Sequence, residues 1–416
     1  MKARNLFLSV AVLFCSCTKT ENIALLSTVG NTSKSNVISA SEALTNLDNE
    51  LRSIYGTDTR SAANTRKVKT INYIDLKGTR TKNGDTECPF YIVEFEDNKG
   101  SAILSADNRV EPVLAILDND VLTESDFASN DLNEIKPYIA SLIRQYADNS
   151  LNAGGLEIRP IEPGGGIDTI YHYVRKPLIK TKWHQRSPYN DLCIIPGIYD
   201  DYANAGCTVI ATSQLVKFHK YPAIINSQSF DWNLLDLCDY GANMIEDARI
   251  EVARFVYNIG CLNGGINYSI NDSDASLLET GSSLKAMGYK NVNTADYSDS
   301  TLRNLIFNNS KPVIISGTCA NIYDGAHSWL LDGWNEYKIK NKKMLIDGTS
   351  QIVYTTTTKV HCNFGYAGSC DGYYTSGVFD TTKSLSPGDI DSKIGDKADT
   401  GSNYNSNLCI IVYDLP

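Results

Sequence analysis

Cys207 and His327 are the two residues of this 416-residue chain best suited to covalent chemistry. A thiol attacks a carbonyl as its thiolate. Because the unperturbed pKa of a thiol is about 8.5, enzymes lower it with a helix N-terminus and a nearby imidazole. Residues 208–221 follow the cysteine without a glycine or proline and are rich in apolar side chains, and Pro222 then stops the segment. The sequence therefore predicts a largely buried helix that begins at Cys207, with the thiol at the positive end of its dipole.

The local sequence alone is weak support for a reactive thiol. Most buried cysteines are inert, and the β-branched residues 208–210 favour a strand over a helix. A more specific signal is the order of four groups along the chain. The groups are Gln185, Cys207, His327 and Asn363. It resembles the order in which papain-like cysteine peptidases carry an oxyanion-hole amide, the nucleophile, its base and an amide that orients the base.

The residues around these four groups resemble the streptopain family of bacterial cysteine peptidases. The matching segments, in chain order, are 182–190, 206–222, 326–333 and 361–374. The resemblance implies that Cys207 is the nucleophile, His327 the general base and acid, Gln185 an oxyanion-hole donor and Asn363 the residue that orients His327. It also implies that peptide bonds are hydrolysed through a thioester.

Two features depart from the family pattern. The family usually has tryptophans in the segment after the asparagine, whereas this chain has Phe364 and Tyr366. Phe364 can shield an imidazole from water but has no indole N–H to donate, so we expect weaker orientation of the histidine and no loss of chemistry. The glycine that precedes the family's histidine is Ala326 here, which is a mild change unless the backbone there needs a positive φ.

Four other polar side chains are further candidates for chemistry. We expect His219 to cap the end of the nucleophile helix or to lie at the surface, and His184 to lie in an exposed loop. His361 precedes the asparagine by two positions, and packing is its expected role. Asp332 is an alternative orienting group for His327. Zinc-binding and phosphate-loop motifs are absent from the sequence, so we expect no metal and no cofactor.

The first seventeen residues predict export. Lys2 and Arg4 precede an apolar run at 6–14 that is too short to span a bilayer and is typical of a signal peptide. Residues 13–17 resemble a bacterial lipoprotein signal, which would make Cys17 a lipidation site and anchor the protein at the outer membrane or cell surface. The alternative is an ordinary signal peptide with a coincidental cysteine, followed by secretion.

Composition narrows the class of protein further. Eleven cysteines in 416 residues are too few for a disulfide-built scaffold, and the sequence does not reveal whether any of them pair. The net charge of -10 offers no basic surface for nucleic acid.

Length and composition favour two domains. The expected divisions are a signal peptide at 1–17, a prosegment at 18–150, a glycine-rich linker at 151–170 that is cut on activation, and a catalytic domain at 171–416. The N-terminal part predicts a helix at 39–55, a hairpin at 90–95 and 101–105, and a second helix at 133–146. Residues 106–115 resemble the prosegment of streptopain-like zymogens, which implies an intramolecular inhibitor; a permanent accessory domain is the alternative.

The expected fold class is α+β, with a papain-like domain in which a helical part packs against an antiparallel sheet. Strands are predicted at 313–315, 329–331 and 409–413, a helix at 247–260, and an extra hairpin between the histidine and the asparagine that includes 338–343 and 355–358. We expect an exported cysteine endopeptidase zymogen that acts on proteins or peptides and is cut between 154 and 180. The alternatives are an inactive binding protein on the same fold and a Cys-His acyltransferase or deamidase.

Overall fold

The structure is a computed structural model, and it describes residues 36–56, 66–75, 88–129, 131, 134–152, 168–195, 202–239, 244–262, 276–318, 326–344, 350–379 and 406–416. The predicted signal peptide and lipidation site lie outside these residues, as does most of the predicted linker. We refer to the described residues of 36–152 as the N-terminal segment and to those of 168–416 as the C-terminal segment.

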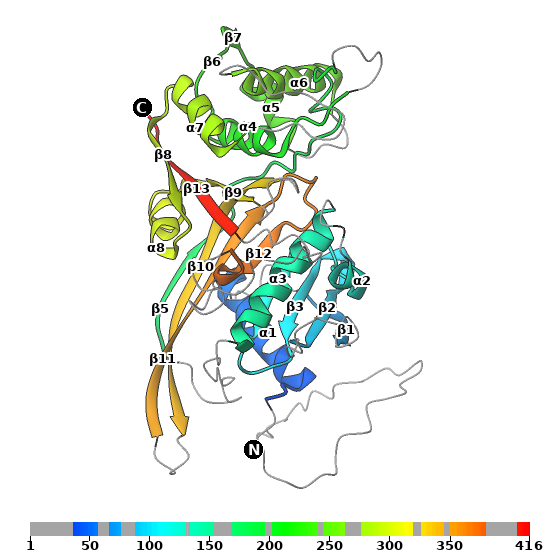
Figure 1. Ribbon diagram of the computed structural model, residues 1–416, viewed down its shortest axis with the longest axis vertical. Helices are drawn as coiled ribbons and strands as arrows, with labels where there is room; N and C mark the ends of the chain where they lie inside the picture. The colour runs from blue at the N-terminus through cyan, green and yellow to red at the C-terminus, as the bar shows by residue number, and fades with distance from the viewer. Residues whose placement is uncertain are drawn as a thin grey trace, which may run out of the picture. The chain divides into compact units, whose positions relative to one another are not determined.

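The N-terminal segment combines a small antiparallel sheet with helices (Figure 1). Its elements are α1 (Ala40–Tyr55), β1 (Val68–Ile74), β2 (Phe90–Phe95), η1 (Glu96–Asn98), β3 (Ser101–Ser105), β4 (Val113–Leu117), α2 (Glu124–Ala128) and α3 (Ile135–Asn152). Ser39 caps α1 by accepting from the backbone N–H of Glu42 at 3.3 Å. The predicted first helix and hairpin are confirmed, and the second helix continues further than predicted, to Asn152.

The C-terminal segment contributes the longer strands. They are β5 (Asp168–Arg175), β8 (Lys290–Asp296), β9 (Val313–Thr318), β10 (Ala326–Met344), β11 (Ser350–Asn363), β12 (Gly372–Thr375) and β13 (Ser406–Asp414). The predicted extra hairpin is confirmed as the distal halves of β10 and β11, which pair from Leu330↔Asn363 to Met344↔Ser350. β5 adds to the free side of this hairpin by pairing with β10.

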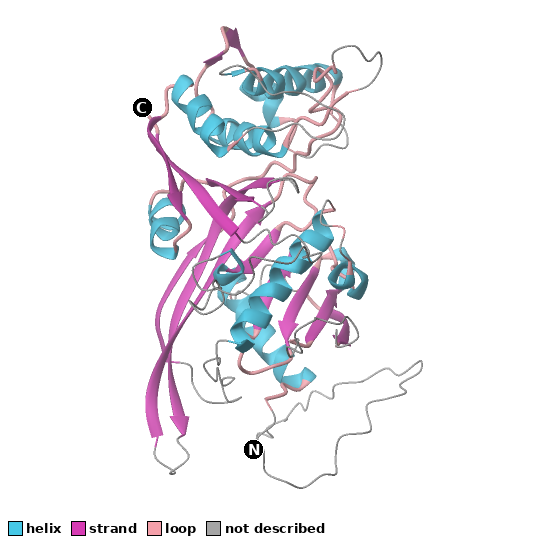
Figure 2. Cartoon of the chain, viewed as in Figure 1, coloured by secondary structure: helices cyan, strands magenta, loops and turns pink. Residues whose placement is uncertain are grey.

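Four helices of the C-terminal segment gather at one end of the sheet, and α8 lies apart from them (Figure 2). The four are α4 (Cys207–His219), α5 (Trp232–Asp236), α6 (Glu246–Gly260) and α7 (Leu277–Ala286). The remaining elements are α8 (Asp299–Leu302), β6 (Ile224–Ile225), β7 (Gln228–Ser229), η3 (Arg303–Asn308) and η4 (Ser376–Phe379). α4 is buried around most of its circumference, and its Ile210 and Leu215 share a core with Leu330 of β10. The α+β class, with helices against an antiparallel sheet, is confirmed.

One sheet runs through both segments. Its strand order is β1-β2-β3-β4-β12-β11-β10-β9-β13-β8, and the junction is the antiparallel pair β4 and β12, from Gly372↔Leu117 to Tyr374↔Ala115. Gly372 is required there because a Cβ at this position would overlap the carbonyl oxygen of Ile116.

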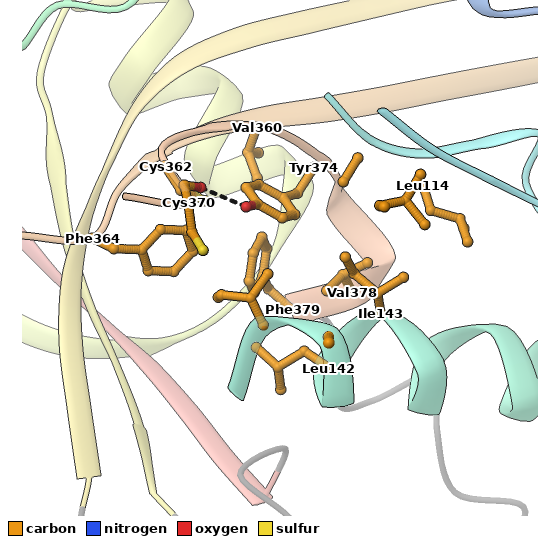
Figure 3. Close-up of a cluster of buried hydrophobic side chains, with 14 of the residues drawn as sticks. Leu114, Leu142, Ile143, Val360, Cys362, Phe364, Cys370, Tyr374, Val378 and Phe379 are labelled. Carbon is orange, nitrogen blue, oxygen red and sulfur yellow. Dashed lines mark hydrogen bonds between the residues drawn. The ribbon is translucent and has the colours of Figure 1, made fainter. Parts of the chain in front are cut away.

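The two segments also share a hydrophobic core beside this junction (Figure 3). Leu114 of β4 and Leu142 and Ile143 of α3 are fully or almost fully buried, and the same cluster contains Tyr374 and Phe379 of the C-terminal segment. Because large side chains from both segments are buried together, the N-terminal segment is folded onto the sheet.

Eight cysteines lie within the described residues, and all of them are free thiols. Among the helices that the structure describes, none has the length and apolar character needed to cross a membrane.

Candidate active site

Cys207 is the first residue of α4, as predicted. The preceding Gly206 has φ 91°, a left-handed conformation that favours glycine and turns the chain sharply into the helix. The β-branched residues Thr208, Val209 and Ile210 are buried, which explains how a run that favours strands lies in a helix: tertiary packing overrides local propensity. The thiol therefore lies at the positive end of a helix dipole, and it is only partly buried.

Strand β10 meets the N-terminus of α4 beside this thiol. The backbone N–H of Ser328 donates to the Sγ of Cys207 at 3.4 Å, and the hydroxyl of Thr208 donates to that of Ser328 at 3.2 Å. Ser328 is the residue after His327 on the same strand. These contacts bring the predicted nucleophile and the predicted base to one junction between helix and sheet.

His327 is buried among aromatic rings. It stacks with Trp329 at 5.8 Å between ring centroids, and it contacts Phe364 and Tyr366 at 6.4 and 5.2 Å. Tyr138 of α3 meets the imidazole edge-on at 6.1 Å. Burial lowers the pKa of His327 to about 4, so the ring is neutral at pH 7.

The imidazole is oriented by a carbonyl. Nε2 of His327 lies 3.1 Å from the carbonyl oxygen of Phe364, and since that oxygen only accepts, Nε2 carries the proton of the neutral ring. Phe364 itself is fully buried and shields the imidazole, as expected at this departure from the family pattern.

Asn363 is close by but bonded elsewhere. Its Oδ1 accepts from Nε2 of Gln214 at 3.1 Å and from the backbone N–H of Gly365 at 3.2 Å, and its Nδ2 donates to the carbonyl of Thr181 at 2.8 Å. Within the described residues, no hydrogen bond joins Asn363 to His327. The amide expected to orient the histidine is thus held against α4 through Gln214, while the neighbouring Phe364 carbonyl contacts the ring.

Gln185 lies near the thiol on a loop tied to the chain before α4. Its carbonyl oxygen accepts from the N–H of Ala205 at 2.8 Å. Burial raises the pKa of Tyr366 to about 12; the nearby Cys207 and Glu134 also raise it, and a hydrogen bond with the Gln185 side chain acts in the opposite direction. Tyr366 therefore lies beside Gln185, Cys207 and His327. The sequence indicated Tyr366 only as a departure from the family pattern.

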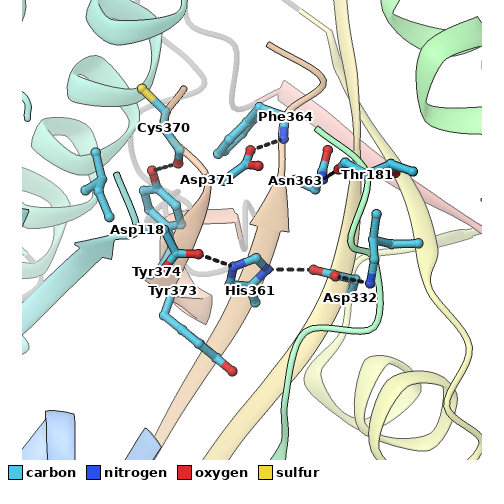
Figure 4. Close-up of polar contacts among 12 residues, drawn as sticks. Asp118, Thr181, Asp332, His361, Asn363, Phe364, Cys370, Asp371, Tyr373 and Tyr374 are labelled. Carbon is cyan, nitrogen blue, oxygen red and sulfur yellow. Dashed lines mark hydrogen bonds and ion pairs between the residues drawn. The ribbon is translucent and has the colours of Figure 1, made fainter. Parts of the chain in front are cut away.

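The structure corrects the expectations for Asp332 and His361 (Figure 4). Nδ1 of His361 lies 2.6 Å from Asp332, and Nε2 lies 3.2 Å from Asp118 of the N-terminal segment. Asp332 is thus bonded to His361, and the prediction that it could orient His327 is wrong. Burial alone would lower the pKa of His361, but the two carboxylates outweigh it and raise the pKa to about 10. His361 is a buried cation, whereas a packing role was predicted.

Asp371 is a supporting residue that sequence reasoning missed. Its Oδ1 accepts from the backbone N–H of Phe364 at 2.8 Å, so it fixes the residue whose carbonyl contacts His327. Burial raises the pKa of Asp371 to about 7. Its place inside the 361–374 segment was the only available signal, because the residue type alone did not distinguish a loop aspartate from a buried one.

Two of the histidines considered in the sequence, His219 and His184, lie outside this cluster. His219 is half-buried, and its Nε2 contacts the Tyr413 hydroxyl at 2.7 Å, while burial lowers its pKa to about 4. His184 is half-buried and accepts from the N–H of Arg186 at 3.3 Å. In the described part of the chain, no group of three or more His, Cys, Asp and Glu side chains is arranged to hold a metal ion.

The N-terminal segment forms hydrogen bonds with the loop that contacts His327. The backbone N–H of Asp118 donates to the carbonyl of Asp371 at 2.8 Å, and the hydroxyl of Ser369 donates to Asp120 at 2.5 Å. Together with Tyr138, these contacts connect the N-terminal segment to the site at several points.

Comparisons with known proteins agree with this organisation. Residues 183–374 match the peptidase C10 family, and residues 35–138 match the Spi protease inhibitor family. The chain is 22% identical over 326 residues to streptopain from Streptococcus pyogenes serotype M28, covering 66% of this chain and 71% of that protein. The structure resembles that of prointerpain A from Prevotella intermedia with a TM-score of 0.52 and 19% identity, over 83% of this chain and 100% of that one.

Proposed function

Because the chain belongs to the peptidase C10 family of cysteine peptidases and carries an inhibitory prosegment, we propose that it is an endopeptidase whose nucleophile is Cys207 and whose base is His327. The observation that carries this proposal is the placement of the Cys207 thiol at the N-terminus of α4, against the β10 residue that follows His327. Its substrates are proteins or peptides.

The proposed reaction is acyl transfer to water. His327 takes the proton of the Cys207 thiol, and the resulting thiolate attacks the carbonyl carbon. The C–N bond then breaks as His327 gives that proton to the leaving amine. Water, deprotonated by His327, then hydrolyses the thioester and restores the thiol. Gln185 and the backbone N–H of Cys207 stabilise the oxyanion that develops on the carbonyl oxygen. Asn363 orients the imidazolium in the active enzyme.

The orientation of the His327 imidazole explains the latency of the proposed zymogen. In the zymogen the imidazole is neutral, directs Nε2 at the Phe364 carbonyl and lies under the ring of Tyr138. Activation then requires that the prosegment leave, so that His327 is rehydrated and turns towards Cys207 and Asn363. The position of Tyr138 over the ring supports this step.

We propose that activation cleavage lies before residue 168. The expected range was 154–180, but residues 168–175 form β5, which is paired with β10, and Ile179 is buried. A cut within β5 would have to open this pairing first, whereas a cut before it leaves β5 in the sheet of the mature enzyme. The remaining range, 154–167, lies outside the described residues.

We also propose export and anchoring through a lipid on Cys17, on the basis of the leader sequence alone. The test is to express the full chain in a bacterium and fractionate the cells beside the Cys17→Ser variant. Anchoring predicts that the unchanged chain is found with membranes and the variant in the soluble exported fraction; the same soluble distribution for both would refute it.

The proposed nucleophile is tested with a peptidyl electrophile that alkylates activated thiols. After activation, mass spectrometry should locate one rapid adduct at Cys207, although the chain carries other thiols such as Cys261. Slow and even labelling of Cys207 and Cys261 would contradict an activated nucleophile.

A further inference from the structure

Three hydrogen-bond donors of the catalytic domain converge on one carboxylate of the prosegment. Nδ2 of Asn335 donates to Oε1 of Glu50 at 3.0 Å, and the hydroxyl of Tyr337 donates to Oε2 at 2.8 Å. Nζ of Lys359 lies 3.8 Å from the same Oε2. Asn335 and Tyr337 are on β10 and Lys359 is on β11, so the donors lie on neighbouring strands of the catalytic domain.

The cluster is built into rigid structure. Asn335 and Lys359 are directly paired across β10 and β11, and both are 0% exposed, while Glu50 is 3% exposed. Nε2 of His172 on β5 lies 2.9 Å from Oδ1 of Asn335, and the hydroxyl of Ser53 in the prosegment contacts both polar atoms of the same amide. The contact with His172 lies within the catalytic domain, because β5 pairs with β10 and β10 pairs with β11 without the prosegment.

Removal of the prosegment takes away the carboxylate that these donors share. Besides Glu50, Lys359 contacts the carbonyl of Val113 at 2.8 Å and Glu111 at 3.6 Å, both in the prosegment. Among the described residues of the catalytic domain, it contacts the Thr375 hydroxyl at 3.1 Å. A buried ammonium group that loses its carboxylates must gain water or another anion. The vacated site then presents one cation and two neutral donors.

The adjoining strand edge is vacated at the same time. β12 pairs with β4 of the prosegment on one side and with β11 on the other, so loss of β4 exposes the backbone of β12. An exposed edge binds extended peptides by strand addition, and nearby pockets select their side chains. Gly372 lets a partner strand approach closely, as Ile116 does in the zymogen.

We propose that Asn335, Tyr337 and Lys359 form a carboxylate-binding site that Glu50 fills in the zymogen and that, after activation, takes an acidic side chain of an extended segment in a protein substrate. The inference rests on the proposed function, since it requires a prosegment that leaves. Glu50 shows the ligand chemistry directly, because its carboxylate stands where the substrate's would bind. Extended protein segments that carry Asp or Glu are therefore the favoured class.

For the test, the full chain is expressed and activated, its prosegment is separated, and Cys207 is alkylated. Peptide binding to the resulting catalytic domain is then measured. The probes are a fluorescent peptide of Gly, Ser and Thr carrying glutamates at alternate positions, and its twin with glutamines. Anisotropy titrations at low salt should show at least tenfold tighter binding of the glutamate peptide, since a charged hydrogen bond contributes more than the difference of about 1.4 kcal/mol that this ratio represents. The preference should shrink in high salt.

Two variants and a matched control decide where that preference arises. Tyr337→Phe removes one donor and keeps the ring, and Lys359→Gln removes the cation; both should abolish most of the preference. Tyr354→Phe, on an exposed tyrosine of β11, should retain it. If Lys359→Gln impairs folding of the zymogen, pairing it with Glu50→Gln removes the unmatched carboxylate, and Tyr337→Phe tests the same site independently.

Equal affinity for the two peptides, or a preference that survives in both variants, would overturn the inference. The same preparations are assayed before alkylation with an unextended fluorogenic peptide. Hydrolysis of that peptide without a glutamate preference would leave the peptidase standing and remove the carboxylate site, whereas absence of hydrolysis would count against the proposed function itself.

Discussion

The buried ion pair between Asp118 and His361 is predicted to hold the prosegment on the catalytic domain. The change that tests it is Asp118→Asn, which keeps the size of the side chain and removes its charge. His361 is 4% exposed, and Nε2 lies 3.2 Å from Asp118. The variant leaves a protonated imidazole in the interface with one carboxylate in place of two.

The expected cost follows from the surroundings of the pair. Removing one partner of a fully buried ion pair costs about 3 to 5 kcal/mol. The side chain of Asp118 is 30% exposed, and Asp332 still contacts the other ring nitrogen at 2.6 Å, so we expect less, about 2 kcal/mol. A loss of that size weakens prosegment binding by roughly 30-fold.

The assay uses the Cys207→Ala chain, which removes the proposed nucleophile. An added protease cuts before residue 168, and the dissociation constant of the cut complex is measured by sedimentation. The matched control is Asp48→Asn, because Asp48 pairs with Arg52 on the surface of α1, where both side chains are more than half exposed, at 58% and 61%. Such a pair contributes little, so the control should bind normally. Equal dissociation constants for the two variants would show that the ion pair between Asp118 and His361 does not hold the prosegment.

Three further predictions concern the Tyr138 ring beside His327, the oxyanion hole and the pH dependence of stability. Tyr138→Ala should let the uncut chain react faster with a peptidyl electrophile, because the ring that covers His327 is gone, whereas Tyr73→Ala, at an exposed prosegment tyrosine, should not. Gln185→Ala should lower kcat of the activated enzyme by about 100- to 1,000-fold with little change in KM, and unchanged kcat would exclude the oxyanion role. The pKa of His361 is raised to about 10 from 6.5, so protonation of this residue stabilises the fold fully below pH 6.5, and this stabilisation is lost as the pH rises towards 10. The Tm of the Cys207→Ala chain should therefore fall more steeply over this pH range than the Tm of the Cys207→Ala, His361→Gln chain. Parallel curves of Tm against pH would argue against a buried imidazolium.

The elements around the nucleophile could be predicted because their signals are local. The absence of glycine and proline from 208–221 placed α4, and a capping serine placed α1. The hairpin of β10 and β11 followed from the length of chain between His327 and Asn363 once those two residues had been assigned to neighbouring parts of the site.

The partners of the site residues could not be predicted in the same way. Asn363 is engaged by Gln214 of α4, and His361 by Asp118 of a different segment, so both outcomes depend on how distant surfaces meet. The addition of β4 to β12 likewise depends on strand register, which neither strand specifies alone. Burial makes His327 neutral, whereas two carboxylates keep His361 protonated despite its burial, and the sequence carries no direct measure of either environment.

The chain is proposed to be a latent peptidase whose nucleophile is Cys207. The most direct measurement is to express residues 18–416 beside the Cys207→Ala variant, follow the size of each chain on a gel, and assay hydrolysis of a mixed peptide library. Only the unchanged chain is expected to lose its prosegment and then cut peptides. If neither chain hydrolyses peptides even after an added protease has removed the prosegment, or if the variant does so as well as the unchanged chain, Cys207 is not the nucleophile of a latent peptidase.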